Sequence, residues 1–156
     1  MWWRRPKAEF ERGKGAANRS ALRRLVREGV PTGILAYAGA RPVGWCSVAP
    51  RQQFPRLAGS RILAPVDDRA VWSIVCLFVA RDWRRRGVSV GLLRAAVAHA
   101  RRLGARLVEG YPVEPRTGAQ PDAFVWTGLA SAFERAGFRE VARRSETRPI
   151  MRYPAR

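Results

Sequence analysis

The most constraining feature of this chain is a largely apolar segment, residues 71–80, followed by a helical pattern and a second strand pattern. Apolar side chains on both faces are typical of a central strand that is covered on both sides. Residues 88–103 then carry an apolar stripe with helical spacing, which Gly104 ends. Residues 106–113 return to a strand pattern. A strand, a crossover helix and a strand of these lengths predict parallel pairing at the centre of a sheet.

The other segments predict antiparallel additions to that centre. Residues 49–70 show no periodicity and are interpreted as an ordered loop, long enough to indicate a functional role. The remaining predicted elements are a helix from Asn18, its N-cap, to residue 28, strands over 33–38 and 43–48, a helix over 127–136, and strands over 138–144 and 148–153. We predict a single α/β (α+β) domain over residues 1–156, with a mixed, centrally parallel twisted sheet flanked by helices.

The charge is unusual for a chain of 156 residues, with 30 Lys+Arg against 12 Asp+Glu and a formal net charge of +18. Such a balance fits a nucleic-acid or anionic partner, and it fits equally a by-product of GC-rich codon usage. The arginines are scattered over every segment, and no RRM, KH or helix-turn-helix pattern is present. No specific nucleic-acid partner is therefore expected, although a basic nucleic-acid-binding module stays open as an alternative.

The scarcity of cysteine and histidine excludes several chemistries. Cys46, Cys76 and His99 show no metal-ligand spacing, so no metal site is expected. Ser73 and Cys76 are expected on opposite faces of a buried strand, which argues against an acyl-cysteine intermediate. Residues 1–6 lack the apolar segment of a signal peptide, and no apolar run approaches the roughly 20 residues of a membrane span. We expect a cytoplasmic protein with no membrane partner.

A glycine- and arginine-rich loop joins the buried strand to the long helix. Its residues are Arg84, Arg85, Arg86, Gly87, Val88 and Ser89. A helix that starts at the carboxyl end of a central strand offers unpaired N–H groups and a partial positive charge, which suit a phosphate. The sequence has neither a P-loop nor G-x-G-x-x-G, so a nucleotidase is excluded and a dinucleotide site is disfavoured. A solvated arginine run that caps a structural helix is the alternative.

The chain resembles the GNAT superfamily of acyl-CoA-dependent N-acyltransferases at two motifs. Residues 84–89 match the pattern [QR]-x-x-G-x-[GA] after a strand that ends in Val79, and Leu92 and Leu93 follow. Residues 132–138 (AFERAGF) are similar to the family's L-Y-x-x-x-G-F. The order of segments agrees from residue 17 to 153. The resemblance implies a GNAT-like acyltransferase fold with acetyl-CoA as co-substrate.

The resemblance also implies residue roles. Leu77, Phe78 and Val79 would present the strand edge to pantetheine, and the Val79 amide would point at the thioester carbonyl and stabilise the oxyanion. The backbone amides of the loop residues 84–89 would bind the pyrophosphate. Ser89 stands where glycine or alanine is usual, and its hydroxyl can donate to a phosphate. Phe133, expected beside the cofactor, replaces a tyrosine that protonates the departing thiolate in many members, so that role cannot be filled from this position.

The start of the chain departs from the family as well. Members usually open with a strand and a helix before the helix expected at residues 18–28, and the sequence leaves little room for them. A shortened N-terminus would leave an open sheet edge and an exposed apolar patch, which predicts a homodimer or an unstable fold.

Residues that could move a proton are few. Glu109 is the candidate base and Tyr111 the candidate relay, since both fall on one face of a strand; the alternative for Glu109 is a solvated position near the strand end. Three aspartates are candidate contacts to a cationic substrate: Asp67, Asp68 and Asp122. The alternative is that they are ordinary turn residues. Trp126 is assigned to the core, with the acceptor pocket as the alternative.

We therefore predict an N-acetyltransferase that moves an acetyl group from acetyl-CoA to a primary amine of a small molecule or peptide by direct attack. The alternative is a catalytically silent GNAT-like domain that binds acyl-CoA.

Overall fold

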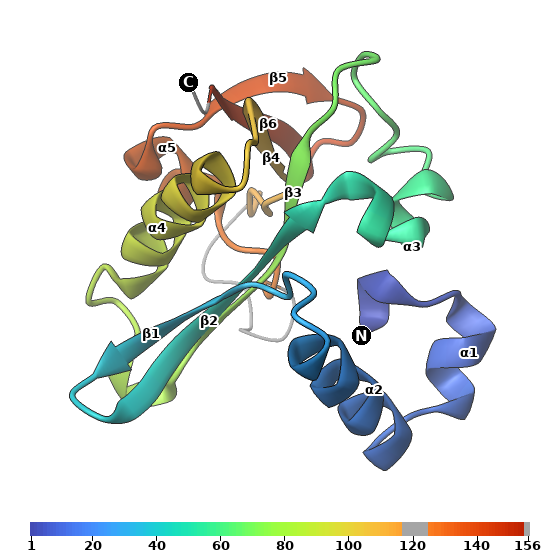
Figure 1. Ribbon diagram of the computed structural model, residues 1–156. Coiled ribbons are helices and arrows are strands. Elements are labelled where there is room, and N and C mark those ends of the chain that lie inside the picture. The colour runs from blue at the N-terminus through green and yellow to red at the C-terminus, as the bar shows by residue number, and fades with distance from the viewer. Residues whose placement is uncertain (117–124, 155–156) are drawn as a thin grey trace.

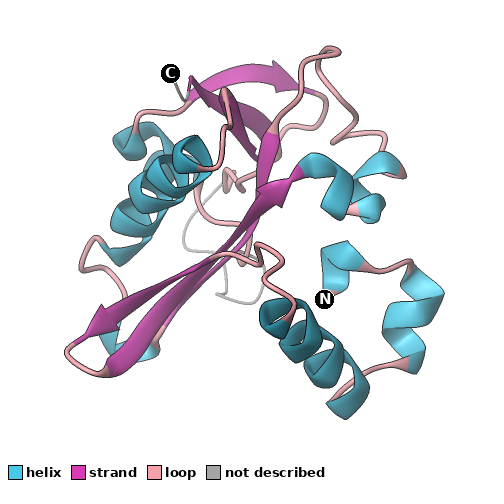
Figure 2. Ribbon diagram, viewed as in Figure 1, coloured by secondary structure: helices cyan, strands magenta, loops and turns pink. Residues whose placement is uncertain are grey.

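The computed structural model describes residues 1–116 and 125–154, which form a twisted sheet with helices on both faces (Figure 1, Figure 2). In spatial order the strands are β1 (Ile34–Ala38), β2 (Arg41–Pro50), β3 (Trp72–Val79), β4 (Leu107–Gly110), β6 (Pro149–Pro154) and β5 (Arg139–Arg143). The strands β3 and β4 pair in parallel, and the other neighbours pair antiparallel. The predicted mixed sheet with a parallel centre is thereby confirmed.

Helices cover the two faces of the sheet unequally. They are η1 (Trp2–Arg4), α1 (Lys7–Arg12), α2 (Ala16–Arg27), η2 (Arg51–Gln53), α3 (Pro55–Ala58), η3 (Arg81–Trp83), α4 (Val88–Arg102) and α5 (Ala130–Ala136). Figure 1 shows α4 and α5 on one face, called the α4 face below, and α3 and the N-terminal helices on the other, the α3 face. No helix in the described residues is long and apolar enough to cross a membrane.

Each face has its own buried core. On the α4 face, Leu92, Leu93, Ala96 and other apolar residues of α4 pack against Cys46, Ile74 and Leu77 of the sheet, as the helical stripe predicts. On the α3 face, Phe54 and Leu57 pack against side chains of the sheet, with Trp3 at the margin. The β3 strand is therefore covered from both sides along its first part, which is why its sequence is apolar throughout.

Two predictions about local structure are wrong. Asn18 is not the N-cap of its helix, because α2 begins earlier, after Gly15. The buried Asn18 side chain instead donates through Nδ2 to the Phe10 carbonyl at 2.9 Å and ties α2 to α1. The segment 49–70 is not entirely loop, since it holds the end of β2, η2 and α3. Neither short helix has a side-chain cap or a periodicity that the sequence could reveal.

One extra residue alters the direction of side chains in β3. Ser47 pairs with Cys76 and Val48 pairs with Ile74, so Val75 is the inserted residue of a β-bulge. Leu77 packs in the core of the α4 face, which places its neighbour Cys76 on the α3 face. Ser73 also faces that side, because its hydroxyl lies 2.8 Å from the Tyr111 hydroxyl. The prediction that Ser73 and Cys76 point to opposite faces is therefore wrong.

Gly110, at the end of the β3–β4 pairing, is expected to tolerate no side chain. A Cβ placed there would lie 2.1 Å from Cε1 of Phe133, whose ring is fully buried. We expect Gly110→Ala to lower the free energy of unfolding by about 1–3 kcal/mol through overpacking. Gly91→Ala is the matched control, because nothing lies within 4 Å of its Cβ position in α4 and alanine favours a helix. Urea unfolding that ranks the two variants equally would contradict this account.

Candidate active site

The candidate site lies where β3 ends and α4 begins. Gly87 is the N-cap of α4 and has φ 78°, in the left-handed region that glycine adopts without strain. Arg85, two residues earlier, also has a positive φ of 58°. The alternation of left-handed residues with others turns successive N–H groups of the loop toward one side, and the first amides of α4 point the same way along the helix axis. This local geometry suits an anion.

The arginine side chains of the loop are divided between structure and solvent. Arg84 donates from Nε to the carbonyl of Val79 at 3.1 Å and so fastens the loop to the strand. The guanidinium of Arg86 lies over the Trp83 ring, 5.4 Å from its centroid, and both Arg85 and Arg86 are exposed. No atom lies within 4 Å of a Cβ built on Gly87. The loop therefore has open space beside its amides and two guanidinium groups near it, which fits the pyrophosphate of coenzyme A.

Among the described residues, the end of β3 beside this loop has an open edge, because β4 pairs only with the first residues of β3. The pairing ends at Ile74 and Gly110. The amide of Leu77 instead donates to the carbonyl of Trp126 at 2.7 Å. The amide of Ala80 donates to Val43 of β2 at 2.8 Å. Amides of a strand alternate between its two edges. The Val79 amide therefore faces the same edge as the Leu77 amide, away from β2.

The side chain of Phe78 points to the opposite face of the sheet from that of Leu77. Its backbone pairs with Trp45 of β2, and its side chain is 54% exposed on the α3 face. Of the three residues predicted to present the strand edge, Leu77 has its amide bonded to Trp126 and Phe78 has its backbone paired with Trp45. In the described residues, only the Val79 amide therefore faces this edge without a partner. The Val88 and Ser89 side chains are half-buried in the first turn of α4.

Phe133 lies at the point where β3 and β4 separate. Its ring is fully buried and packs against the backbone of Gly110 and Gly128 and, edge to face, against Phe138 at 5.0 Å. The ring bears no group that can donate a proton, so a departing thiolate either takes its proton from solvent or another group or leaves unprotonated. The position beside the open edge agrees with its expected place next to the cofactor, which stays a prediction.

Glu109 and Tyr111 lie in a buried ionic cluster on the α3 face. Arg51 and Arg152 both bond the carboxylate of Glu109, at 3.2 Å and 2.7 Å. The Tyr111 hydroxyl donates to Glu109 at 2.7 Å, and burial beside this carboxylate raises the pKa of Tyr111 well above its usual range. The interpretation of Glu109 as a solvated residue is wrong, because the residue has no exposed surface. Both carboxylate oxygens of the candidate base Glu109 are therefore engaged, one by Arg51 and Tyr111 and the other by Arg152.

Other candidates have structural partners as well. Asp67 bonds Arg69 and Arg152, and these two side chains hold the pKa of the carboxyl well below its usual range. Asp122 lies outside the described residues. The ring of Trp126 stacks at 5.7 Å on Trp3, whose Nε1 donates to the Val75 carbonyl at 3.0 Å. Trp3 carries no local pattern that could have predicted this contact, which spans 72 positions.

The thiol of Cys76 is expected to react slowly. Burial raises the pKa of this thiol to about 11. At pH 8 about 0.1% would then be thiolate, so labelling by a disulfide reagent should run about 200-fold slower than for a free cysteine of pKa 8.5. The rate should rise about tenfold per pH unit up to the thiol's pKa. Labelling as fast as that of a free thiol, and absent from Cys76→Ser, would contradict this.

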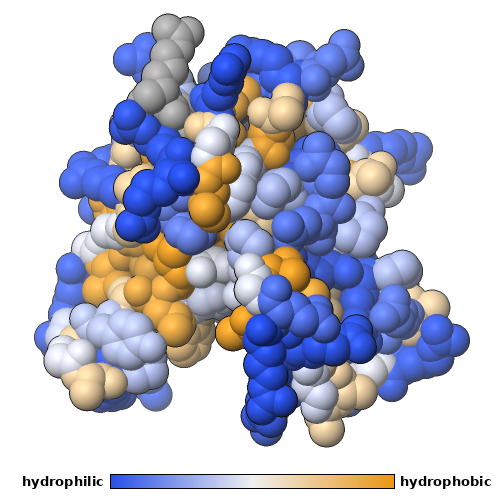
Figure 3. Space-filling model, viewed as in Figure 1, coloured by the Kyte–Doolittle hydropathy of each residue, from blue (hydrophilic) through white to orange (hydrophobic). Residues whose placement is uncertain are grey.

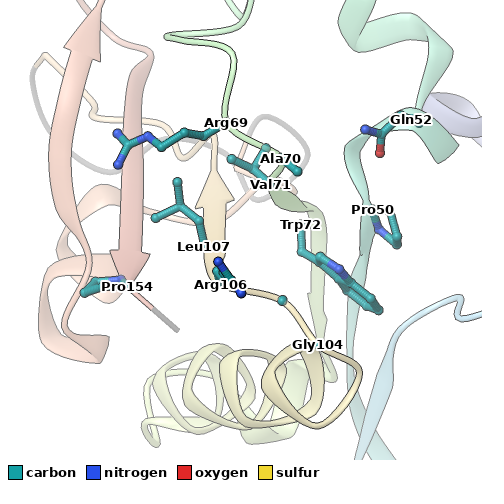
Figure 4. Close-up of a pocket in the computed structure, with 11 residues that line it drawn as sticks. Pro50, Gln52, Arg69, Ala70, Val71, Trp72, Gly104, Arg106, Leu107 and Pro154 are labelled. Carbon is teal, nitrogen blue, oxygen red and sulfur yellow. The ribbon is translucent and has the colours of Figure 1, made fainter. Parts of the chain in front are cut away.

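A separate cavity of about 930 Å³ opens at the other end of the parallel strands (Figure 4). It is lined by Trp72 at the start of β3, by Arg106 and Leu107 before and in β4, and by Arg69 and Pro154. At about 3.3 Å per residue, the length of β3 places Trp72 about 23 Å from Val79. The cavity is thus distinct from the loop and the open edge.

Comparison with solved structures shows the fold. A putative acetyltransferase of the GNAT family from Desulfovibrio desulfuricans is 19% identical, with 88% of this chain and 78% of that chain covered and a TM-score of 0.56. A putative acetyltransferase from Salmonella typhimurium, solved with its cofactor acetyl-CoA, is 13% identical, with 88% and 73% covered and a TM-score of 0.56. The ribosomal-protein-S18-alanine N-acetyltransferase from Escherichia coli is 13% identical, with 85% and 76% covered and a TM-score of 0.51.

Comparison with sequences shows the family. No curated protein matches this chain. The profile of the Acetyltransferase (GNAT) family matches residues 1–121, which include the open edge of β3, the loop and α4. Because that match covers most of the chain and contains the first of the two motifs, residues 84–89, the protein belongs to the GNAT acetyltransferase family.

Proposed function

We propose that this protein is an N-acetyltransferase that takes an acetyl group from acetyl-CoA, the donor that the family uses, and passes it to a primary amine by direct attack. The single observation that carries the proposal is the junction of β3 and α4. There an open strand edge that bears the Val79 amide stands next to a helix start whose amides suit a pyrophosphate. Acetyl-CoA would supply the activated acetyl group as a thioester.

The residues of the chain would bind and position in this reaction. The amides of residues 84–89 hold the phosphates, assisted by Arg85 and Arg86. The Val79 amide donates to the acetyl oxygen and stabilises negative charge that develops there; loss of one such donor typically lowers the rate by about 10²–10³-fold. Glu109 and Tyr111 remain the proposed base and relay. Because both lie in the buried cluster, the variant that tests them is Glu109→Gln, which keeps the shape of the side chain.

Two measurements test the proposal. Millimolar acetyl-CoA should raise the melting temperature, because a ligand that binds only the folded state stabilises it. Incubation with acetyl-CoA and a panel of amines should release free thiol above the rate without amine. Absence of a thermal shift would overturn acetyl-CoA binding, and a shift without amine-dependent thiol release would overturn catalysis.

The second outcome would favour a catalytically silent domain that binds acyl-CoA. Two observations favour that alternative. Phe133 lacks an acidic hydroxyl, and the Glu109 carboxylate is bonded to two arginines.

A further inference from the structure

An apolar row with exposed ends and a half-buried middle residue, Trp45, crosses three strands on the α3 face and ends beside the Val79 amide. Leu35 of β1 pairs with Trp45 of β2, and Trp45 pairs with Phe78 of β3. Directly paired residues share one face of a sheet, so the three side chains form a continuous row. Leu35 is 54% exposed and Phe78 is 54% exposed, while Tyr37 beside the row is 59% exposed. We call Leu35, Tyr37, Trp45 and Phe78 the apolar strip.

The strip lies beyond the helices that cover the rest of this face. Figure 3 shows an open notch between the far end of the β1–β2 hairpin and α2, with apolar surface at its inner end. Strands lie about 4.8 Å apart, so the row from Leu35 to Phe78 extends about 10 Å. That length matches a substituted aromatic ring, and Phe78 adjoins Val79 in the chain, which brings such a ring next to the reacting centre.

The ionic surroundings of the strip are cationic. Arg81, Arg85 and Arg86 are exposed around the end of β3, and the carboxylate of Asp82 is neutralised by Arg41 at 2.9 Å. Cys76, on the same face, has a thiol whose raised pKa keeps it uncharged. With the phosphates of acetyl-CoA on Arg85 and Arg86, an alkylammonium ion that approached Val79 would still meet the Arg81 guanidinium, and it would lose water against an apolar surface.

The described residues also offer no carboxylate ready to take the proton of an ammonium acceptor at the strip. Outside Asp68 and Glu134, every carboxylate in the described residues is ion-paired with arginine or lysine. Asp68 lies before the far end of β3, and Glu134 belongs to α5 on the other face. His99 packs against Trp72 at that same far end, with ring centroids 6.2 Å apart.

The geometry points to a specific class of acceptor, an inference that rests on the proposed function: an arylamine, whose ring lies on the apolar strip and whose nitrogen is neutral at physiological pH. A neutral amine needs no base before attack. Its nitrogen forms the C–N bond, the C–S bond breaks, the thiolate leaves, and the proton of the former amine passes to solvent, either directly or through the proposed relay Tyr111 and base Glu109. Alkylammonium and polyamine acceptors are correspondingly disfavoured.

Two isomeric amines give the sharpest test. 4-Ethylaniline and 2-phenylethylamine have the same atoms and nearly the same apolar area, but only the second is an ammonium ion at pH 7. We expect kcat/KM for 4-ethylaniline, measured by thiol release, to exceed that for 2-phenylethylamine by about tenfold or more, and spermidine to be slowest. Added salt should raise the rate with 2-phenylethylamine, because it screens the arginines, and leave 4-ethylaniline unchanged. Equal or faster transfer to the ammonium acceptors would overturn the inference while leaving the proposed function intact.

Variants of the strip test the docking surface independently. Leu35→Ser and Phe78→Ser should each raise KM for 4-ethylaniline about tenfold, because apolar contact area is lost. Val141→Ser is the matched control, an exposed apolar residue on the opposite edge strand β5, and should leave KM unchanged. If the strip variants behave like Val141→Ser, the strip is not the acceptor surface.

Two further readouts separate the inference from the proposed function. If acetyl-CoA gives no thermal shift and the proposed function fails, quenching of tryptophan fluorescence by 4-ethylaniline still reports on the strip. The inference is supported if quenching is lost in Phe78→Ser and kept in Val141→Ser. Equal quenching in the two variants overturns it. Sedimentation should show a monomer. A stable dimer that Phe78→Ser dissociates would show that a second copy covers the strip, which would also overturn the inference.

Discussion

Gly87→Asp is expected to weaken acetyl-CoA binding about 30- to 150-fold while the protein stays folded. The side chain would be placed at the N-cap of α4, next to amides that we propose to hold the pyrophosphate. A carboxylate there accepts hydrogen bonds from those amides itself and repels the phosphates. A loss of about two or three kcal/mol of binding free energy corresponds to a loss of about 30- to 150-fold in affinity. A residue other than glycine is strained at this positive φ, but aspartate tolerates the left-handed region better than most residues, caps helices and has open space here, so the helix should persist.

Gly87→Asn is the matched control, because asparagine has the same shape, caps a helix and tolerates a positive φ, but carries no charge. Calorimetric titration with acetyl-CoA should show a much smaller loss for asparagine than for aspartate, and Arg86→Glu combined with Gly87→Asp should bind weakest. Urea unfolding should give similar midpoints for both single variants. Equal affinities of the aspartate and asparagine variants would show that the phosphates are held elsewhere.

Glu109→Ala is expected to lower the free energy of unfolding by about 3–5 kcal/mol, which is typical when one member of a buried ionic cluster is removed. The change leaves the largely buried Arg51 without its carboxylate partner, and it leaves Arg152, 5% exposed, with Asp67 alone. It also removes the acceptor of the Tyr111 hydroxyl. Arg51 additionally donates to the carbonyls of Leu57 and Leu63, so the segment that carries α3 should loosen first.

The control is Glu140→Ala, whose carboxylate pairs with Arg143 at the surface; such pairs contribute little, so urea unfolding should barely change. Because Glu109→Ala can fail to fold, Glu109→Gln keeps the shape and most hydrogen bonds and should lose less stability. Its turnover also tests the proposed base. A fall in kcat of a hundredfold or more with unchanged KM for acetyl-CoA would support Glu109 as base, since general bases contribute about 10²–10⁴-fold. Retained kcat would leave it a structural residue.

The parts of the fold that the sequence predicted well are those whose signal is local. The strands β1, β2 and β3 and the helix α4 follow from periodicity and from the glycines that end them, and the predicted bounds differ from the observed ones by a few residues. The helix α3 and the N-cap of α2 were missed, since a four-residue helix has almost no periodicity and Asn18 is held by a contact to Phe10 rather than by its own helix. The bulge at Val75 left no mark in an apolar run, so the faces of Ser73 and Cys76 were assigned wrongly.

The candidate site likewise has a part that the sequence predicted and a part that it did not. The loop that suits a pyrophosphate could be read from the chain because its residues are consecutive, and a helix start has the same unpaired amides wherever it occurs. By contrast, the row Leu35, Trp45 and Phe78 depends on which residues pair across strands, and the cluster joins Arg51 to Glu109 over 58 positions and Asp67 to Arg152 over 85. The sequence by itself therefore determined the sheet with its parallel centre, the family motifs and the anion-binding loop. Only the tertiary structure decided that Glu109 is buried between arginines and that an uncharged strip leads to Val79, because burial and pairing arise from contacts between distant segments rather than from neighbours in the chain.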